Sequence, residues 1–287
     1  MSGHWRRLLA DRGAWIGGAL VVAMLLVALA RPWIAPKDPL APDIDRGLTA
    51  QGAPMPPSAE SPLGTDQLGR DVWSRVVAGT GSSLEIAALA TTIAVALGLL
   101  VGLIAGYAGG WVDAVLMRFV DLVLAFPFLL LAILLAALFR QTALADSNAP
   151  VVITLGAIGW TTMARVVRGK TAVLARGGVA IAARALGASP ARIVMRHILP
   201  NLGGIAIVVA TLGFAQNLLA ESVLSYLGVG PPPPAPTWGR MLFEGRAYYR
   251  TAPHLAIAPG LAILIAVIAF NLLGERLRVH LDPKERV

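Results

Sequence analysis

Six stretches of the chain, each of at least 18 residues, contain no Asp, Glu, Lys or Arg. They are residues 13–30, 86–112, 122–139, 147–164, 198–220 and 251–274. A helix rises 1.5 Å per residue, so a run of about 20 apolar residues crosses the roughly 30 Å hydrocarbon core of a membrane. Backbone amides and carbonyls in lipid must be bonded within their own segment, which favours helices. The pattern predicts an all-α polytopic membrane protein with six transmembrane helices.

The first stretch, residues 13–30, follows several arginines and ends in Ala28-Leu29-Ala30, which resembles a cleavage site. A secretory signal peptide has a shorter apolar region, of about 7–15 residues, and Trp33-Ile34 extends this one further. We therefore interpret it as an uncleaved membrane anchor. Residues 1–82 are expected to form this anchor helix and an extracytoplasmic loop, and residues 83–287 a five-helix core.

The composition supports a membrane protein. Hydrophobic residues make up 56% of the chain, charged residues only 14%, and the mean hydropathy is +0.71; a soluble domain has about 25% charged residues. A buried helix of a large soluble protein could explain one such stretch, but six of them leave too little charge for a soluble surface. The absence of cysteine excludes a disulfide framework and a cysteine-based metal site. The four histidines are scattered and form no metal-ligand spacing.

The net charge of +8 is unevenly distributed along the chain. In a soluble protein it would suggest nucleic-acid binding, but segment 165–197 holds seven Lys and Arg residues, and residues 147–220 contain no carboxylate. Cytoplasmic loops of membrane proteins carry an excess of Lys and Arg. Placing residues 165–197, a short turn at 109–121 and both termini in the cytoplasm puts 15 basic residues inside and nine outside. This bias explains the charge without a nucleic-acid partner.

The predicted outer loop, residues 35–82, is rich in Pro and Gly and is expected to be irregular. Residues 63–73, at its end, alternate Asp and Arg and include two glycines. This pattern suggests a tight, hydrogen-bonded turn that leads into the second span. The residues by themselves favour the alternative, a solvated loop in which Asp66 or Asp71 caps the helix.

The second span contains three glycines at four-residue intervals: Gly98, Gly102 and Gly106. Such a stripe allows a neighbouring helix to approach closely, so a packing role is expected. The helix is expected to end near Tyr107, ahead of the turn-like Gly109-Gly110. Arg118 and Asp121, three residues apart, are expected to pair at the inner face.

The basic segment 174–201 has the pattern of two short helices. An Ala-rich helix over about residues 179–186 is expected to stop at Gly187, where a C-cap glycine belongs. Ser189 is expected to cap a second helix that has Pro190 at its first position. Two short helices joined at a glycine in a basic loop favour docking on another protein. An amphipathic helix at the membrane surface is the alternative.

The same segment resembles the EAA loop of ATP-binding-cassette importer permeases, in which Glu-Ala-Ala is followed by Gly four residues on and then by Ile-Leu-Pro. The matching residues are Ala182, Ala183, Gly187, Ile198, Leu199 and Pro200. Ile181 stands at the glutamate position, a departure that concerns one polar contact rather than the docking. The resemblance implies that about residues 171–200 form a coupling loop, seated in a groove of an ATPase subunit, with these seven residues at the contact.

Further motifs resemble the dipeptide/oligopeptide/nickel branch of this family, and the resemblance extends from about residue 64 to 283. They are Gly-Thr-Asp-x-Leu-Gly-Arg-Asp at 64–71, Gly106-Tyr107, Gly110-Trp111-Val112-Asp113, Phe126-Pro127, residues 165–169, Ser225-Tyr226-Leu227-Gly228, Trp238-Gly239 and Asn271-Leu272-Leu273-Gly274. Each motif alone is weakly specific, but together they are highly specific.

The resemblance implies a transport subunit rather than an enzyme, in the cytoplasmic (inner) membrane of a prokaryote. Its implied partners are a homologous second permease, two ATP-binding-cassette ATPases and an extracytoplasmic solute-binding protein. ATP and Mg²⁺ are implied on the ATPases, and no cofactor on this chain. The implied solutes are di- and oligopeptides. Importers of nickel chelates, or of other small solutes such as opine- and glycoside-like compounds, share the architecture.

Residues 164–171 match a loose P-loop pattern with Ala in the place of the first Gly. A P-loop follows a strand, and its glycines let backbone amides wrap a phosphate. Here the motif ends a predicted membrane helix and contains one glycine, Gly169. We interpret its basic residues as anchors at the cytoplasmic face, which leaves ATP hydrolysis to a partner.

Asn217 and Glu221, near the outer end of the fifth span, are candidates for the translocation pathway or its gate. An ionisable group at membrane depth is a functional candidate by default. The alternative for Glu221 is a carboxylate near the outer surface that bonds a neighbouring helix.

Two other classes of protein remain as alternatives. A secondary transporter driven by an ion gradient would carry acids or a proton-relay histidine in mid-span, and the six charge-free stretches argue against such acids. An intramembrane enzyme would need a nucleophile and a base, or a metal cluster, facing each other at depth. The sequence offers no such set.

Overall fold

The computed structural model describes residues 11–281; residues 1–10 and 282–287, at the two termini expected in the cytoplasm, lie outside the described residues. This described part is helical and contains no β-strand. Its long helices are α2 (Arg12–Leu29), α5 (Val72–Ala108), α8 (Ala149–Ala175), α11 (Leu199–Tyr226) and α13 (His254–Leu281). The shorter helices are α3 (Arg31–Ile34), α4 (Ile44–Gly47), α6 (Gly110–Ala125), α7 (Phe128–Phe139), α9 (Gly178–Ala185), α10 (Pro190–Ile193) and α12 (Trp238–Gly245).

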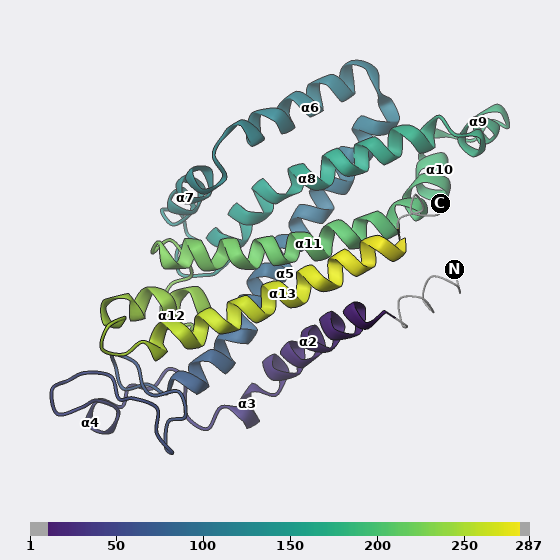
Figure 1. Cartoon of the computed structure of the whole chain (residues 1–287). Coiled ribbons are helices and arrows are strands. Elements are labelled where there is room, and N and C mark those ends of the chain that lie inside the picture. Colours follow the sequence, from purple (N-terminus) through teal and green to yellow (C-terminus); the bar gives the residue numbers. More distant parts are fainter. Residues whose placement is uncertain (1–10, 282–287) are drawn as a thin grey trace.

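The long helices run side by side and give the molecule two ends (Figure 1). α5 packs along α8, α11 contacts α13, and α2 lies against α13 and α5. One end, called here the α9 end, carries α9, α10, the start of α2 and the end of α13. The opposite end, called the α12 end, carries α3, α4, α12 and the irregular segment 35–71. Segments that are far apart in the sequence therefore meet at each end.

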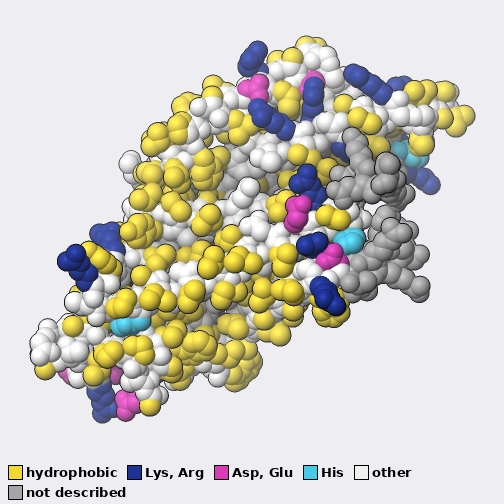
Figure 2. Space-filling model, in the orientation of Figure 1, with side chains coloured by type: hydrophobic (Ala, Val, Ile, Leu, Met, Phe, Trp, Pro, Cys, Tyr) yellow, Lys and Arg dark blue, Asp and Glu magenta, His cyan; other side chains and the backbone are white. Residues whose placement is uncertain are grey.

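The surface agrees with a membrane location. In Figure 2, hydrophobic side chains cover much of the middle of the molecule, whereas charged side chains gather toward its ends. Large apolar side chains such as Leu26, Leu100 and Leu264 are exposed on the long helices. By length and composition, five helices of the described part could cross a membrane, or six if α6 and α7 together count as one span. The all-α, membrane-spanning prediction is confirmed.

The third predicted span is not a single straight helix. A helix was expected over residues 122–139 after a short turn at 109–121, but α6 already begins at Gly110, and α6 and α7 meet at an angle of 92°. The break falls at Phe126-Pro127, where Phe126 is extended (φ −80°, ψ 138°). Proline lacks an amide N–H and disfavours a helical conformation in the residue before it. Phe126-Pro127 was singled out as a motif of the sequence, but the break in the helix was not predicted from it.

Several helices extend beyond the charge-free stretches that predicted them. α5 begins at Val72 rather than near Ile86, and α11 continues past Glu221 to Tyr226. Charged residues within these extensions, such as Arg75 and Glu221, are buried against other protein segments, so they do not end the helices. At its other end α5 stops at Ala108, close to the expected Tyr107, and Gly109 (φ 63°) follows as its C-cap. The boundary expected between residues 82 and 83 falls within α5.

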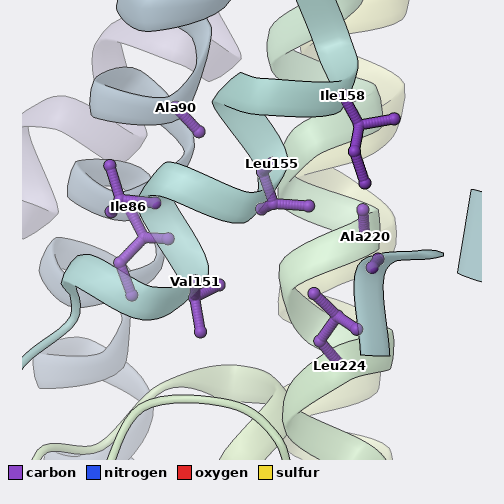
Figure 3. Packing of buried hydrophobic residues seen from close by; sticks show 9 residues of the cluster. Ile86, Ala90, Val151, Leu155, Ile158, Ala220 and Leu224 are labelled. Atoms are coloured by element: carbon purple, nitrogen blue, oxygen red, sulfur yellow. The ribbon is translucent and has the colours of Figure 1, made fainter. Parts of the chain in front are cut away.

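The core depends on close contact between α5 and α8. A β-carbon at Gly98 would lie 2.5 Å from Cβ of Met163, and one at Gly102 would lie 2.7 Å from the carbonyl oxygen of Ala164. The packing role expected for the glycine stripe is confirmed. Toward the α12 end, α11 joins this pair through a buried apolar cluster (Figure 3). The residues labelled in that view are Ile86, Ala90, Val151, Leu155, Ile158, Ala220 and Leu224.

Candidate functional site

The predicted coupling segment at the α9 end has a defined turn. α9 ends at Ala185, and Gly187 adopts φ +80°, a left-handed conformation that glycine accepts without steric cost. The amide of Ala188 donates to the carbonyl of Ala183, and the amide of Gly187 donates to that of Arg184, both at 3.0 Å. This pair of hydrogen bonds is the Schellman motif, which satisfies the free carbonyls at the end of a helix. The C-cap expected at Gly187 is confirmed.

The second predicted helix is also present and continues into the membrane-length helix. The Ser189 side chain accepts a hydrogen bond from the amide of Arg192 (3.4 Å), and Pro190 is the first residue of α10. A π-helical turn, Val194–Ile198, then links α10 to α11. Pro200 lies at the start of α11, and since proline has no N–H to donate to a carbonyl four residues back, a wider turn is suited to this position.

The residues implied at the coupling contact fall into two groups. Ile181 and Ala182 on α9 are exposed, as is Gly187, with Ile181 54% exposed and the neighbouring Leu186 88% exposed. Ile198, in contrast, is buried in a cluster with Ala180 and Ile193, against which Ala183 packs. Leu199 is half-buried and Pro200 is exposed. The segment therefore has an apolar outer face and an inner side that anchors it to α11.

The ion pairs near the α9 end differ from the expected pair of Arg118 with Asp121. Asp121 pairs with Arg165, not with Arg118, and Asp113 pairs with Arg168. Both pairs connect α6 to α8, because the acids and the arginines lie on helices that face each other. The stretch 164–171 lies inside α8, so no glycine-rich loop exists there to hold a nucleotide phosphate.

A buried ionic cluster occupies the α12 end. Glu244 of α12 accepts hydrogen bonds from Arg75 of α5 (2.8 Å) and from Arg70 (2.9 Å), and Arg240 binds its other oxygen at 3.0 Å. Asp66 accepts from the Arg70 side chain at 2.7 Å. The Arg75 side chain is 1% exposed. The cluster thus ties the loop before α5 to α12 through charges that water barely reaches.

The loop that supplies Asp66 is a tight turn, and not the solvated loop that the residues of 63–73 by themselves favoured. Asp66 accepts hydrogen bonds from the amides of Leu68 (2.9 Å) and Arg70 (3.0 Å), and Gly69 has a positive φ of 73°. Asp71 caps α5 by accepting from the amide of Ser74 (2.8 Å). The turn and the cap at Asp71 are therefore both present, and the loop is buried rather than solvated.

The charges of this cluster set the ionisation of Glu244. Burial alone would raise the pKa of the Glu244 carboxyl, but the charge of Arg75, the hydrogen bond from Arg240 and the charge of Arg70 outweigh it. The pKa of Glu244 therefore lies below its ordinary value. Glu244 was not among the residues predicted to be functional. The sequence does contain a signal for it, because Glu244 is the only carboxylate between Glu221 and Glu275 and has arginines on both sides.

α12 is also held by uncharged contacts. The Trp238 amide donates to the Ser83 hydroxyl (3.2 Å), and the Trp238 ring nitrogen donates to the carbonyl of Val76 (3.1 Å). A β-carbon at Gly239 would lie 2.5 Å from the carbonyl oxygen of Ser222 on α11. α12 is thereby fixed to both α5 and α11.

Glu221 and Asn217 lie one turn apart on α11 and have different surroundings. Glu221 is fully buried; the Ser225 hydroxyl donates to one carboxylate oxygen at 2.7 Å, and the Ser222 hydroxyl lies 3.4 Å from the other. Asn217 donates from its amide nitrogen to the Thr91 hydroxyl of α5 at 2.9 Å and lines a cavity between α5, α8 and α11. Across residues 11–281, no group of three His, Cys, Asp or Glu side chains is arranged to hold a metal ion.

Comparison with known proteins gives the family. Residues 98–287 match the family described as the binding-protein-dependent transport system inner membrane component, and residues 2–57 match the N-terminal TM domain of oligopeptide transport permease C. The chain is 40% identical over 280 residues to the glutathione transport system permease protein GsiD of Escherichia coli and of Shigella boydii. These matches cover 98% of this chain and 89% of each relative.

A solved structure shares the fold. It is an inward-facing conformation of the MetNI methionine ABC transporter, with a TM-score of 0.56, 21% sequence identity, and coverage of 71% of this chain and 95% of that chain. The fold is that of a polytopic helical permease. The chain belongs to the binding-protein-dependent transport family and is the permease subunit of an ATP-binding-cassette importer. It is a transport subunit and not an enzyme, and the gradient-driven alternative is set aside.

Replacing Glu244 tests the ionic cluster. Glu244→Gln leaves Arg75 buried without a full counter-charge, which is expected to destabilise the permease by about 3–5 kcal/mol. Asp121→Asn is the matched control, since it breaks an exposed ion pair worth at most about 1 kcal/mol. Thermal unfolding of both variants in detergent measures the difference. Equal midpoint temperatures of unfolding for the two variants would contradict a structural role for the cluster.

The same variant tests how the stability of the folded permease depends on pH. Because the pKa of Glu244 in the folded protein is below the ordinary 4.5, its stabilising contribution is complete above pH 4.5 and is lost as the pH falls through the folded pKa. Acidification below about pH 4.5 should therefore narrow the stability gap between the original chain and Glu244→Gln.

Proposed function

We propose that this chain is one of two permease subunits that carry di- and oligopeptides across the cytoplasmic membrane. The relatives that it matches along nearly their full length are named as permeases for glutathione, which is itself a tripeptide. Nickel chelates and other small solutes handled by the same architecture are the alternative. The proposed second permease is a homologue of this chain, and a solute-binding protein delivers the solute at the α12 end.

The outer face of α9 supports the proposal that this chain is coupled to an ATPase. Ile181 and Leu186 expose apolar side chains at the end of the bundle, next to the basic residues Arg184 and Arg192. A large exposed apolar group rimmed by charge is typical of a protein-binding surface. We propose that an ATPase subunit covers it, and that two such ATPases bind the ATP and Mg²⁺ that drive transport.

Replacing Gly187 tests the proposed coupling role of this turn and the proposed peptide solute in one experiment. Gly187→Val should reduce uptake of a labelled dipeptide by roughly 5–30-fold, because a left-handed conformation costs a side chain about 1–2 kcal/mol. Gly187→Asn should keep most of the uptake, since asparagine tolerates this conformation. Uptake is measured in cells whose own copy of this chain is deleted.

Gly18→Val is the control for this experiment, because it makes the same change in α2 at a position with open space and no positive φ. Normal uptake with Gly187→Val would remove this turn from the mechanism. If the unaltered chain restores uptake of a nickel chelate but not of any peptide, the proposed solute class is wrong while the coupling result still stands.

The proposed orientation puts the α9 end and both termini in the cytoplasm and the α12 end outside. Ser58, in the loop at the α12 end, and Ser189, at the α9 end, are both exposed, and the chain has no cysteine of its own. Ser58→Cys should therefore react with a membrane-impermeant thiol reagent in intact cells, and Ser189→Cys only after the cells are opened. The reverse pattern would overturn the orientation.

We propose that Glu221 acts in gating or in holding α11 to its neighbours, rather than by contacting the solute. Its burial and its two serine partners support this role. Glu221→Gln should lower the transport rate or reduce the stability of the complex by roughly 1–3 kcal/mol, as expected for a broken buried hydrogen bond. Substrate preference should stay the same, as measured by competition between peptides. A changed preference in Glu221→Asp, with assembly unaffected, would show direct contact instead.

A further inference from the structure

A cavity of about 160 Å³ lies between α5, α8 and α11. A cavity volume of roughly 10–15 Å³ is enough to hold one water molecule, so this cavity has room for part of a solute. Its polar wall consists of Thr91, Thr162, Gln216 and Asn217. Thr91, Thr162 and Gln216 each lie well inside their own helices, so the polar wall is at membrane depth.

Several polar groups of this wall have hydrogen-bonding capacity left over. Asn217 is only 7% exposed and uses its amide nitrogen on Thr91, while its carbonyl oxygen accepts no hydrogen bond within residues 11–281. The Thr162 hydroxyl and the Gln216 amide are exposed and likewise unbonded in that part of the chain. Thr91, Thr92 and Thr211, by comparison, each donate to the carbonyl four residues earlier. Three residues with unused hydrogen-bonding groups, Thr162, Gln216 and Asn217, therefore line one cavity.

Free polar groups at this depth need a partner. Exposing an amide or a hydroxyl to hydrocarbon without a hydrogen bond costs several kcal/mol, so these side chains must face water, another protein chain or a solute. Glycine keeps the space between them open: a β-carbon at Gly159 would lie 3.7 Å from the Asn217 carbonyl oxygen, in the cavity. No Asp, Glu, Lys, Arg or His lines the cavity.

We propose that this cavity is a contact site on the translocation pathway for neutral hydrogen-bonding groups of the solute, the backbone amides of a peptide. This inference rests on the proposed function. A peptide bond offers one donor and one acceptor, and the Gln216 and Asn217 amides and the Thr162 hydroxyl can pair with both. The second permease completes the site from the opposite side.

The lack of charge in the site has a consequence for specificity. The peptide termini and charged side chains find no counter-charge here, so the site accepts peptides without regard to their charge. The contacts are also individually weak, because each neutral hydrogen bond to the solute replaces one that the solute made to water. A solute in transit must bind well enough to enter and weakly enough to leave, and a neutral site meets both conditions.

In the alternative, Gln216 and Thr162 hydrogen-bond to the second permease and only hold the two subunits together. Introducing a charge separates the two roles. Gln216→Glu keeps the size of the side chain and places a negative charge in the cavity. If the solute passes this point, the maximal uptake rate should depend on peptide charge; if the residue only joins the subunits, the charge of the peptide should not matter.

The experiment uses the complete importer in proteoliposomes, with saturating binding protein and saturating dipeptide. The ratio of maximal uptake rates for a lysine-containing and a glutamate-containing dipeptide is compared between variants. Gln216→Glu should change this ratio by about 25-fold, which combines about fivefold from attraction of the lysine peptide and about fivefold from repulsion of the glutamate peptide, each the effect of one charge pair 4 Å apart in water. Gln51→Glu makes the same change in an exposed loop at the α12 end and should leave the ratio unaltered. An unchanged ratio in Gln216→Glu overturns the proposal.

A second variant covers the case in which Gln216→Glu does not assemble. Gln216→Cys should react with a small thiol reagent in the assembled importer, and transported dipeptide with binding protein should slow that reaction. The exposed control Gln51→Cys should react without such protection. An unreactive Gln216→Cys would place the residue in a closed contact between permeases and overturn the proposal. If the original importer takes up no peptide at all, the proposed function fails first.

Discussion

The close approach of α5 and α8 is the contact on which the other helices depend. Helices in lipid gain little from burying apolar surface against each other, so their association relies on packing at short range. The glycines at 98, 102 and 106 bring the backbone of α5 against Met163, Ala164 and Arg168 of α8. α11 contacts both of these helices, and the cavity at Asn217 lies where the three meet. A larger side chain at one of these glycines would therefore displace more than a single helix pair.

The two ends of the bundle are stabilised in different ways. At the α12 end, Arg70 of the first loop and Arg75 of α5 bind Glu244 of α12 through buried charges, and such groups are costly to separate because each would remain unpaired. At the α9 end, the ion pairs of Asp113 and Asp121 are more exposed, and exposed pairs contribute little to stability. The α12 end is thus the more rigidly connected one, while the α9 end offers surface for a partner.

Much of this arrangement could be predicted from the sequence, because its signals are local. Charge-free stretches located the spans, and Gly187 and Ser189 marked the end of one short helix and the start of the next. The failures came from longer-range contacts. Arg75 could sit inside a helix because Glu244, 169 residues later, neutralises it, and Asp121 pairs across helices with Arg165 rather than along its own helix with Arg118. The break at Pro127 was a local signal that the count of apolar residues did not take into account.

The isoleucine at position 181 changes the physics of the proposed docking rather than abolishing it. A glutamate there would have to lose water on docking and would then need a cation opposite it, in a contact that salt weakens. Ile181 and Leu186 instead gain from leaving water, by up to about 1.5–3 kcal/mol for a side chain that becomes fully buried. An apolar contact has no preferred hydrogen-bond direction, so it can persist while the helices tilt during transport. The orientation must then come from the backbone, and the two hydrogen bonds that close the turn at Gly187 supply it.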